Sequence, residues 1–206
     1  SELVSNSLRG TFFKQERQSK VDSLSKHPEL AFEKDFLRWM LSDGAGAVLL
    51  QPSPRKQGQS LKIEWILERS YANEMDACMY AGAEKLSDGR LKSWRSFSQE
   101  EWLEKSIFSI KQDVKQLNKH VVHYTIERPL QELMEKKALK ADQIDFFLPH
   151  YSSHFFREKF YQGMQKVGFD IPFERWFDNL SSKGNIGSAS IYIMLDELIH
   201  SGLLKA

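Results

Sequence analysis

The chain has 206 residues, is 41% hydrophobic and has a formal net charge of +1, so it can bury a core and has no global field that would favour nucleic acid or an anionic membrane. No apolar run approaches the roughly 18 residues that a spanning helix needs. The single cysteine, Cys78, excludes an internal disulfide and favours a reducing compartment. The first residues lack the basic start and apolar middle of a signal peptide, and we expect a cytoplasmic protein.

The N-terminal part predicts little regular structure. Residues 1–38 mix aromatic and charged residues with an interrupting proline, and we predict a mostly irregular segment. Gly44 and Gly46 permit a close backbone approach before a short apolar run that predicts a strand at 47–50. The stretch 51–60 contains prolines and a glycine, and it predicts a surface turn.

The middle of the chain predicts one strand and one long helix. The stretch Leu61 to Tyr71 predicts a half-buried strand, because apolar residues at alternate positions from 61 to 67 face one side and charged residues the other. The stretch 71–96 has no sustained periodicity and predicts a long loop. Ser98 and Glu101 form the pattern of a capping box. A long helix is predicted to begin there, because apolar residues then recur at spacings of three and four: Leu103, Ile107, Ile110, Val114, Leu117 and Val121.

The last third predicts helices alternating with a short strand. Pro129 should end or kink the long helix, and a second helix should continue to about Leu139. An apolar run at 144–148 predicts a buried strand, followed by a helix from about Ser152. A linker at 172–184 precedes a last helix from about 187 to 201. Helices that alternate with short buried strands favour an α/β fold.

Two polar side chains are the candidate site residues. His150 lies where the predicted strand gives way to a helix, and Asn185 lies in a glycine-containing loop before the last helix. Ligands of open α/β sheets collect beyond the carboxyl ends of the strands, so a polar side chain there is well placed for chemistry. The alternatives are a hydrogen-bonded structural histidine and a left-handed turn asparagine between glycines.

Three sequence blocks carry a family resemblance: Leu148-Pro149-His150, then Gly-Asn-Ile-Gly-Ser-Ala-Ser at 184–190 with Leu-Asp-Glu behind it, and earlier Ser-Asp-Gly-Ala-Gly-Ala at 42–47. Taken in chain order, these blocks resemble the beta-ketoacyl-acyl-carrier-protein synthase III family, which consists of condensing enzymes of the thiolase superfamily. The resemblance implies a thiolase-like layered sandwich of two fused halves. Residues 1–60 would be the end of the N-terminal half and the connection, and 61–206 the C-terminal half without its final strands.

The resemblance also implies an activity. It predicts an acyltransferase that condenses an acyl thioester with malonyl-carrier protein in a decarboxylative Claisen reaction, in fatty acid or polyketide-like lipid synthesis. His150 and Asn185 would be catalytic, donating neutral N–H groups to the enolate oxygen. The family's nucleophilic cysteine would precede Ser1, so we expect this chain to be inactive alone. Acyl-CoA or acyl-carrier-protein thioesters are the expected substrates, and no cofactor is expected.

An acidic acyl carrier protein is the partner that the resemblance implies, and the full-length protein is expected to be a homodimer. Arg157, Lys159 and Lys166 follow His150 on the next predicted helix and are the candidate carrier-protein-binding residues. The alternative is that they are solvated helix charges.

Further alternatives concern the thiol, a metal and the reaction. Cys78 has no cationic neighbour in sequence and is expected to be a packing thiol rather than the nucleophile. His150 and His154 have helical metal-ligand spacing but no Glu or Cys partner, so no metal is expected. Tyr-Ser-Ser at 151–153, in place of the family's Gln-Ala-Asn, favours longer or unusual acyl chains. A non-catalytic synthase-like subunit, or acyl transfer to a hydroxyl or amine with His150 as general base, are the alternative functions.

Overall fold

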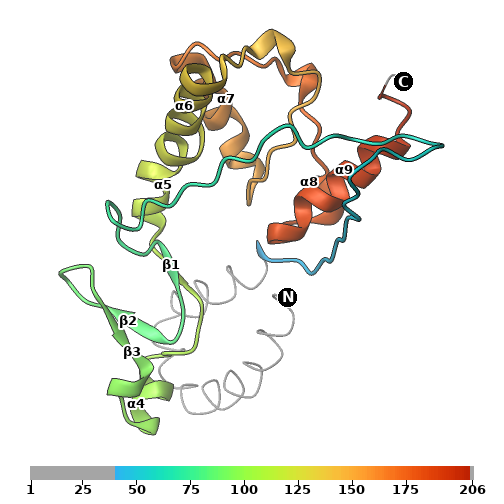
Figure 1. Cartoon of the computed structure of the whole chain (residues 1–206). Helices are drawn as coiled ribbons and strands as arrows, with labels where there is room; N and C mark the ends of the chain where they lie inside the picture. Colours follow the sequence, from blue (N-terminus) through green and yellow to red (C-terminus); the bar gives the residue numbers. More distant parts are fainter. Residues whose placement is uncertain (1–39, 205–206) are drawn as a thin grey trace. The chain divides into compact units, whose positions relative to one another are not determined.

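The computed structural model describes residues 40–204 (Figure 1). The chain forms two compact units, one of Ser1–Met40 with Ser70–Val121 and the other of Leu41–Arg69 with Val122–Ala206. The prediction for 1–38 lies outside the described residues, and the expected division into thiolase-like halves at residue 60 stays a prediction. No helix of the described residues is long and apolar enough to cross a membrane.

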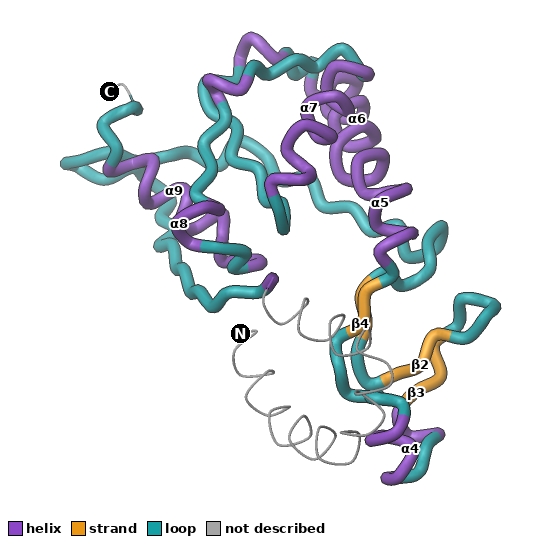
Figure 2. Tube along the Cα trace, turned by 180° about the vertical axis from the view of Figure 1, so that it is seen from behind, coloured by secondary structure: helices purple, strands orange, loops and turns teal. Residues whose placement is uncertain are grey.

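The first unit, called here the hairpin unit, contains two small antiparallel sheets of two strands each within its described residues 70–121 (Figure 2). Strand β1 (Met79–Tyr80) pairs with β4 (Lys111–Gln112), and β2 (Ala83–Lys85) pairs with β3 (Leu91–Ser93). The prediction of a long loop at 71–96 is therefore wrong over the β2–β3 hairpin. The turn between these strands needs Gly89, which has φ of 85°.

The predicted long helix is also interrupted in the hairpin unit. The capping box is confirmed: Ser98 Oγ accepts from the Glu101 amide at 3.3 Å, and the Glu101 carboxylate accepts from the Ser98 amide at 2.8 Å. Helix α4 (Gln99–Glu104) then ends, and Ser106 adopts a left-handed conformation with φ of 50°. Ile107 is fully buried because the chain folds back on the hairpin. The apolar spacing that resembled one helix thus belongs to α4, a turn, the residue before β4 and a second helix that begins at Val114.

Helix α5 (Val114–Val122) belongs to the hairpin unit except for its last residue. In the second unit, called here the pocket unit, the chain continues from Val122 as a π-helical turn (His123–Glu127) and then α6 (Arg128–Lys137). Pro129, which lacks an N–H, lies in the first turn of α6 and does not end the helical path; the wider π turn precedes it instead. The predicted end near Leu139 is confirmed within two residues by the left-handed Ala138, with φ of 49°.

Helix α7 (Arg157–Lys166) lies beside α6 and the π turn (Figure 1). A glycine permits this packing, because a Cβ on Gly163 would collide with Val122. Lys166 of α7 also pairs with Glu127 of the π turn at 2.9 Å. The helix predicted from about Ser152 is therefore confirmed, with its first turn a short 3-10 segment at His154–Phe156.

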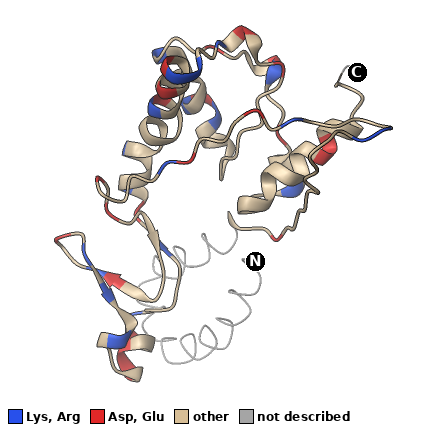
Figure 3. Cartoon of the chain, viewed as in Figure 1, with Lys and Arg blue, Asp and Glu red and all other residues tan. Residues whose placement is uncertain are grey.

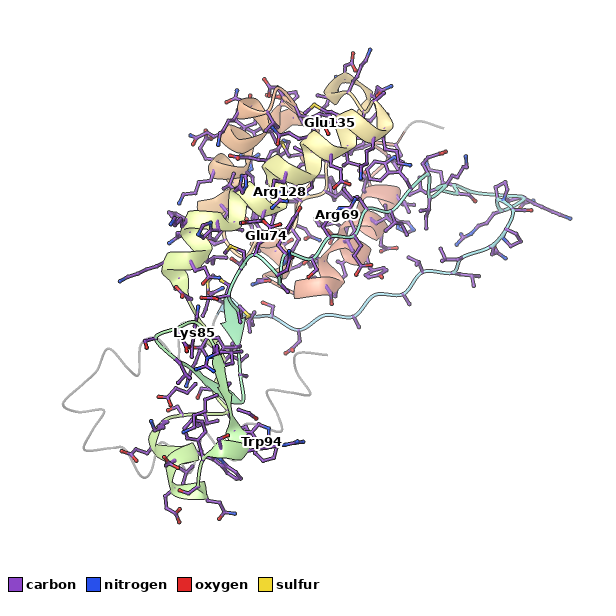
Figure 4. The ribbon with its side chains drawn as sticks, turned by 60° about the vertical axis from the view of Figure 1, so that its left-hand side comes forward. Arg69, Glu74, Lys85, Trp94, Arg128 and Glu135 are labelled. Carbon is purple, nitrogen blue, oxygen red and sulfur yellow. The ribbon has the colours of Figure 1, made fainter. Side chains whose placement is uncertain are left out.

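The three predicted strands of the pocket unit are not formed as ladders. The segment 144–148 contributes one parallel bridge, Phe147 with Trp176. The segments 47–50 and 61–71 form no strand and have no strand partner among the described residues, and Leu49 is 78% exposed. A segment with strand-like apolar residues forms a strand only where a neighbouring strand supplies backbone hydrogen bonds. The lack of such a neighbour explains these three errors. The adjoining Arg69 donates to Glu132 of α6 at 2.7 Å (Figure 4).

The C-terminal part of the pocket unit consists of α8 (Leu180–Lys183), a 3-10 turn (Gly187–Ala189) and α9 (Ser190–His200), which confirms the predicted last helix. The glycines of the 42–47 block allow the close approach that was predicted for them. A Cβ on Gly46 would collide with Tyr192, and one on Gly44 would lie 3.0 Å from Ile186. The 42–47 block therefore packs on the segment that contains Asn185.

Candidate functional site

A small pocket in the pocket unit brings together the loop at 149–151, the segment 178–184 and the first half of α9. Its lining residues are Pro149, His150, Tyr151, Asp178, Asn179, Leu180, Gly184, Ser190 and Met194. Two of the sequence blocks that carry the family resemblance therefore reach the same pocket, although they are far apart in the chain.

His150 lies on the pocket wall as an exposed residue between two buried neighbours, Pro149 and Tyr151. Proline restricts the backbone of the residue before it and fixes its own φ, so the chain enters the histidine with little freedom. The imidazole is accessible from solvent while the loop that carries it is held in place. This is the arrangement expected for a side chain that acts on a ligand.

Asn185 follows the pocket residue Gly184 and is itself buried, with 8% exposed area. Its Oδ1 accepts from the Gly187 amide at 3.3 Å, and its backbone carbonyl accepts from the Ser42 amide at 2.8 Å. The alternative of a left-handed turn asparagine is wrong, because the non-glycine residues with positive φ in the described chain are Ser106 and Ala138. The direction of the Asn185 amide toward the pocket stays a prediction.

The contact between Tyr151 and Asp178 could not be predicted from the sequence. The Tyr151 hydroxyl donates to Asp178 Oδ2 at 2.7 Å, and both residues line the pocket. Burial, and then the Asp178 carboxylate, raise the pKa of Tyr151 well above its usual value, so the phenol stays a donor at neutral pH. Tyr151 was visible as a departure from the family pattern, but no spacing rule connects it with Asp178.

A second set of contacts fastens the pocket wall to α9. The Asn179 amide donates to Glu197 at 2.6 Å, and Lys183 pairs with the other oxygen of the same carboxylate at 3.2 Å. The hydrogen bond from Asn179, and then Lys183, hold the pKa of Glu197 below its usual value. His154 lies 3.0 Å from Ser181 Oγ through its Nε2 atom. Residues 40–204 contain no group of three His, Cys, Asp or Glu that could hold a metal ion.

The three candidate carrier-binding residues have different surroundings. The Arg157 guanidinium lies 3.9 Å from the Phe173 ring centroid, Lys159 lies 3.9 Å from that of Phe155, and Lys166 pairs with Glu127. At 3.6 residues per turn, Lys159 and Lys166 share one side of α7 and Arg157 lies on the other. Acidic and basic residues are mixed on α6 and α7 (Figure 3). A common carrier-binding face stays a prediction.

Cys78 lies in the hairpin unit and has the environment of a packing thiol. Its Sγ donates to the Asp113 carbonyl at 3.5 Å. Burial, and then the Asp113 charge, raise the pKa of the Cys78 thiol. A raised pKa disfavours the thiolate that a nucleophile needs.

Comparison with known proteins finds a family match that covers the residues lining the pocket. Residues 134–206 match the family described as 3-oxoacyl-[acyl-carrier-protein] synthase III C terminal. The matched residues contain both the His150 loop and the Asn185 loop. The pocket thus lies in the part of the chain that resembles a class of condensing enzymes. The stretch 134–206 is thus similar to the C-terminal region of the 3-oxoacyl-acyl-carrier-protein synthase III family. The described residues combine helices with short strands, which agrees with the predicted α/β class, and the thiolase-like layered sandwich stays a prediction.

Two curated relatives illustrate the extent of the similarity. Beta-ketoacyl-acyl-carrier-protein synthase III of Trichodesmium erythraeum is 28% identical, with 81% of this chain and 45% of the relative covered. The protein of the same name from Acholeplasma laidlawii is 32% identical over 41% of this chain and 26% of the relative. The chain therefore spans less than half the length of these relatives.

Solved structures of similar proteins overlap with smaller parts of the chain. The 3-oxoacyl-acyl-carrier-protein synthase III of Aquifex aeolicus has 28% identity and a TM-score of 0.39, with 48% of this chain and 30% of that chain covered. The corresponding enzyme of Pseudomonas aeruginosa has 16% identity and a TM-score of 0.42, with 66% and 40% covered. Overlaps of this size do not define a fold, and the similarity to the family rests on the match over residues 134–206.

Proposed function

We propose that the protein to which this chain belongs is a 3-oxoacyl-acyl-carrier-protein synthase III-like acyltransferase. It would join an acyl thioester to malonyl-carrier protein with loss of carbon dioxide. The observation that carries the proposal is the pocket shared by His150 and Gly184, the residue before Asn185, within the stretch that matches the family.

The chemistry requires donors for a developing negative oxygen. Loss of carbon dioxide breaks a carbon–carbon bond of the malonyl group and leaves its electron pair in an enolate. In the proposal, the His150 imidazole N–H and the Asn185 amide donate to the enolate oxygen, and neither carries a proton acidic enough for the enolate to capture. The enolate carbon then attacks the acyl thioester carbonyl, and the thiolate leaves.

The acyl-carrying cysteine of this scheme comes from outside the residues of the pocket. Cys78 does not suit the role, because burial, and then the Asp113 charge, raise the pKa of its thiol. We therefore propose that a part of the protein outside this chain supplies the nucleophile. A homodimer, cytoplasmic location and the absence of a cofactor belong to the same proposal.

The proposal has a direct test with the protein, an acyl-CoA and malonyl-carrier protein labelled at the free carboxyl group. We expect labelled carbon dioxide and a 3-oxoacyl product, and a loss of about 100- to 1000-fold in rate for both His150→Ala and Asn185→Ala. His200→Ala is the matched control, because His200 on α9 bonds the Asp196 carbonyl and does not line the pocket. An ester or amide product without carbon dioxide would identify the non-decarboxylative alternative, and no turnover would favour a non-catalytic subunit.

The carrier-binding part of the proposal is tested separately on α7. Lys159→Glu should raise the KM for carrier-bound substrate severalfold and leave a small malonyl thioester unaffected, because charge complementarity acts on docking. Arg157 is less suitable for charge reversal, since its guanidinium lies 3.9 Å from Asp178 of the pocket. Equal responses of both substrates to Lys159→Glu would remove the docking role.

A further inference from the structure

Tyr151 and Asp178 connect the two sides of the pocket. Tyr151 directly follows His150, Asp178 comes from the segment before α8, and the phenol–carboxylate hydrogen bond is 2.7 Å long. We propose that Tyr151, fastened to Asp178, is a positioning residue that fixes the His150 imidazole. The inference rests on the proposed function for its effect on rate, although the positioning itself can be measured without it.

The Tyr151 ring is held on more than one side. It is 4% exposed, and its ring centroid lies 6.0 Å from that of Phe160 and 5.8 Å from that of His154, both in edge-to-face geometry. Such contacts stabilise one rotamer of a buried aromatic side chain. Because Tyr151 and His150 share a peptide unit, a fixed Tyr151 backbone limits the positions that His150 can take.

The other end of the bond is equally fixed. The Asp178 side chain is 17% exposed, and Arg157 Nε lies 3.9 Å from the oxygen that accepts the phenol proton. Arg157 is itself placed over the Phe173 ring at 3.9 Å. A carboxylate acceptor makes a stronger hydrogen bond than a neutral one, and the nearby guanidinium offsets its charge. The bond therefore joins two anchored side chains across the pocket.

Positioning has a specific consequence for the proposed reaction. An oxyanion donor works only at the place where the charge develops, and a misplacement of about 1 Å can cost on the order of 100-fold in rate. Tyr151→Phe keeps the ring and removes only the hydroxyl, so the His150 imidazole should move by less than about 1 Å. We expect a fall of roughly tenfold in kcat with KM nearly unchanged, because donor geometry changes and substrate contacts do not.

The chain offers a control tyrosine on α7. The Asp170 carboxylate raises the pKa of Tyr161, so this phenol also interacts with a carboxylate, but Tyr161 does not line the pocket. Tyr161→Phe should leave kcat unchanged. Asp178→Asn should retain most activity, since the amide oxygen can still accept from Tyr151, whereas Asp178→Ala should resemble Tyr151→Phe. The double variant Tyr151→Phe with Asp178→Ala should be no worse than either single variant.

The closing experiment combines these rates with imidazole NMR of the protein labelled at histidine, with the His150 signal assigned by His150→Gln. We expect Tyr151→Phe to shift or broaden the His150 signal, and Tyr161→Phe to leave it unchanged. The inference is overturned if Tyr151→Phe alters neither the His150 signal nor kcat. It is also overturned if Tyr151→Phe and Tyr161→Phe have the same effect on them. A shifted signal in a protein that forms no condensation product would support positioning while removing the proposed function.

Discussion

The two units use polar side chains in different ways. In the hairpin unit, Lys85 is 14% exposed and donates to the Ala77 carbonyl, Asp113 and Gln116, so its charge serves the fold (Figure 4). In the pocket unit, comparable contacts surround an opening and leave His150 exposed on its wall. In the hairpin unit these hydrogen bonds join protein groups to one another and stabilise the fold. In the pocket unit they hold the wall of a pocket that solvent or a ligand can reach.

The aromatic residues show the same contrast. Trp94, Trp102 and Phe108 of the hairpin unit pack on one another with ring centroids 5.3 to 5.9 Å apart. In the pocket unit, the Tyr151 ring packs on Phe160, and the Tyr151 hydroxyl donates a hydrogen bond to Asp178 on another segment of the pocket. We therefore expect the proposed chemistry in the pocket unit and a stabilising role for the cluster around Lys85.

The largest expected effect tests where the chemistry lies. His150→Ala should reduce the condensation rate about 100- to 1000-fold, as expected for loss of one enolate donor. Cys78→Ser should leave the rate unchanged, because that thiol lies in the hairpin unit and its pKa is raised. Steady-state rates of both variants check this. A comparable loss of rate in Cys78→Ser would mean that the hairpin unit also takes part in the reaction, and the two units would no longer differ in this respect.

The next effect concerns the hairpin unit. Lys85→Met should reduce the free energy of unfolding by about 2 kcal/mol, because the Ala77 carbonyl and the Gln116 side chain each lose a hydrogen-bond donor. Lys62→Met is the control, since the Lys62 and Glu64 side chains of its ion pair are 79% and 64% exposed. Urea unfolding followed by fluorescence measures both. If Lys85→Met is as stable as the wild type, the cluster does not hold the hairpin unit together.

The third effect tests helix packing in the pocket unit. Gly163→Ala would stabilise an isolated helix by about 1 kcal/mol, but here the added methyl would collide with Val122. We expect a net loss of about 2 kcal/mol from overpacking. Gln165→Ala, at an exposed position of the same helix, should have the opposite sign or no effect. Thermal unfolding of the two variants decides between propensity and packing.

The sequence predicted those elements whose causes are local. The Ser98 capping box, the end of α6 and the helix α9 depend on neighbouring residues and were placed within a few positions. The hairpin at 83–93 was missed, although Asp88 and Gly89 are a turn signal, because strands of three residues are too short to show alternation.

The strands that were wrongly predicted and the site residue that was missed both depend on contacts between residues far apart in the chain. Residues 61–67 alternate as a strand does, yet the described chain supplies no neighbouring strand. His150 and the Asn185 loop were found because their blocks resemble a family. Asp178 was not found, because its contact with Tyr151 exists only after α7 has folded back on the loop.

The smallest effect is a pH dependence at the contact between α7 and the π turn. Glu127 accepts from His123 at 3.0 Å and from Lys166 at 2.9 Å, and these contacts, that of His123 first, hold the pKa of Glu127 below its usual 4.5. A carboxyl group with a lowered folded-state pKa stabilises the fold above its unfolded pKa and loses that contribution as pH falls through the folded value.

Glu127→Gln should therefore be less stable than the wild type at pH 7, by about 1 to 2 kcal/mol. The difference should shrink below about pH 4.5, where the unfolded wild type begins to bind the proton that the folded state resists. Unfolding curves at several pH values measure it, with the exposed Glu135→Gln as the control. A difference that does not change with pH would mean that shape, rather than the charge of Glu127, holds α7 against the π turn.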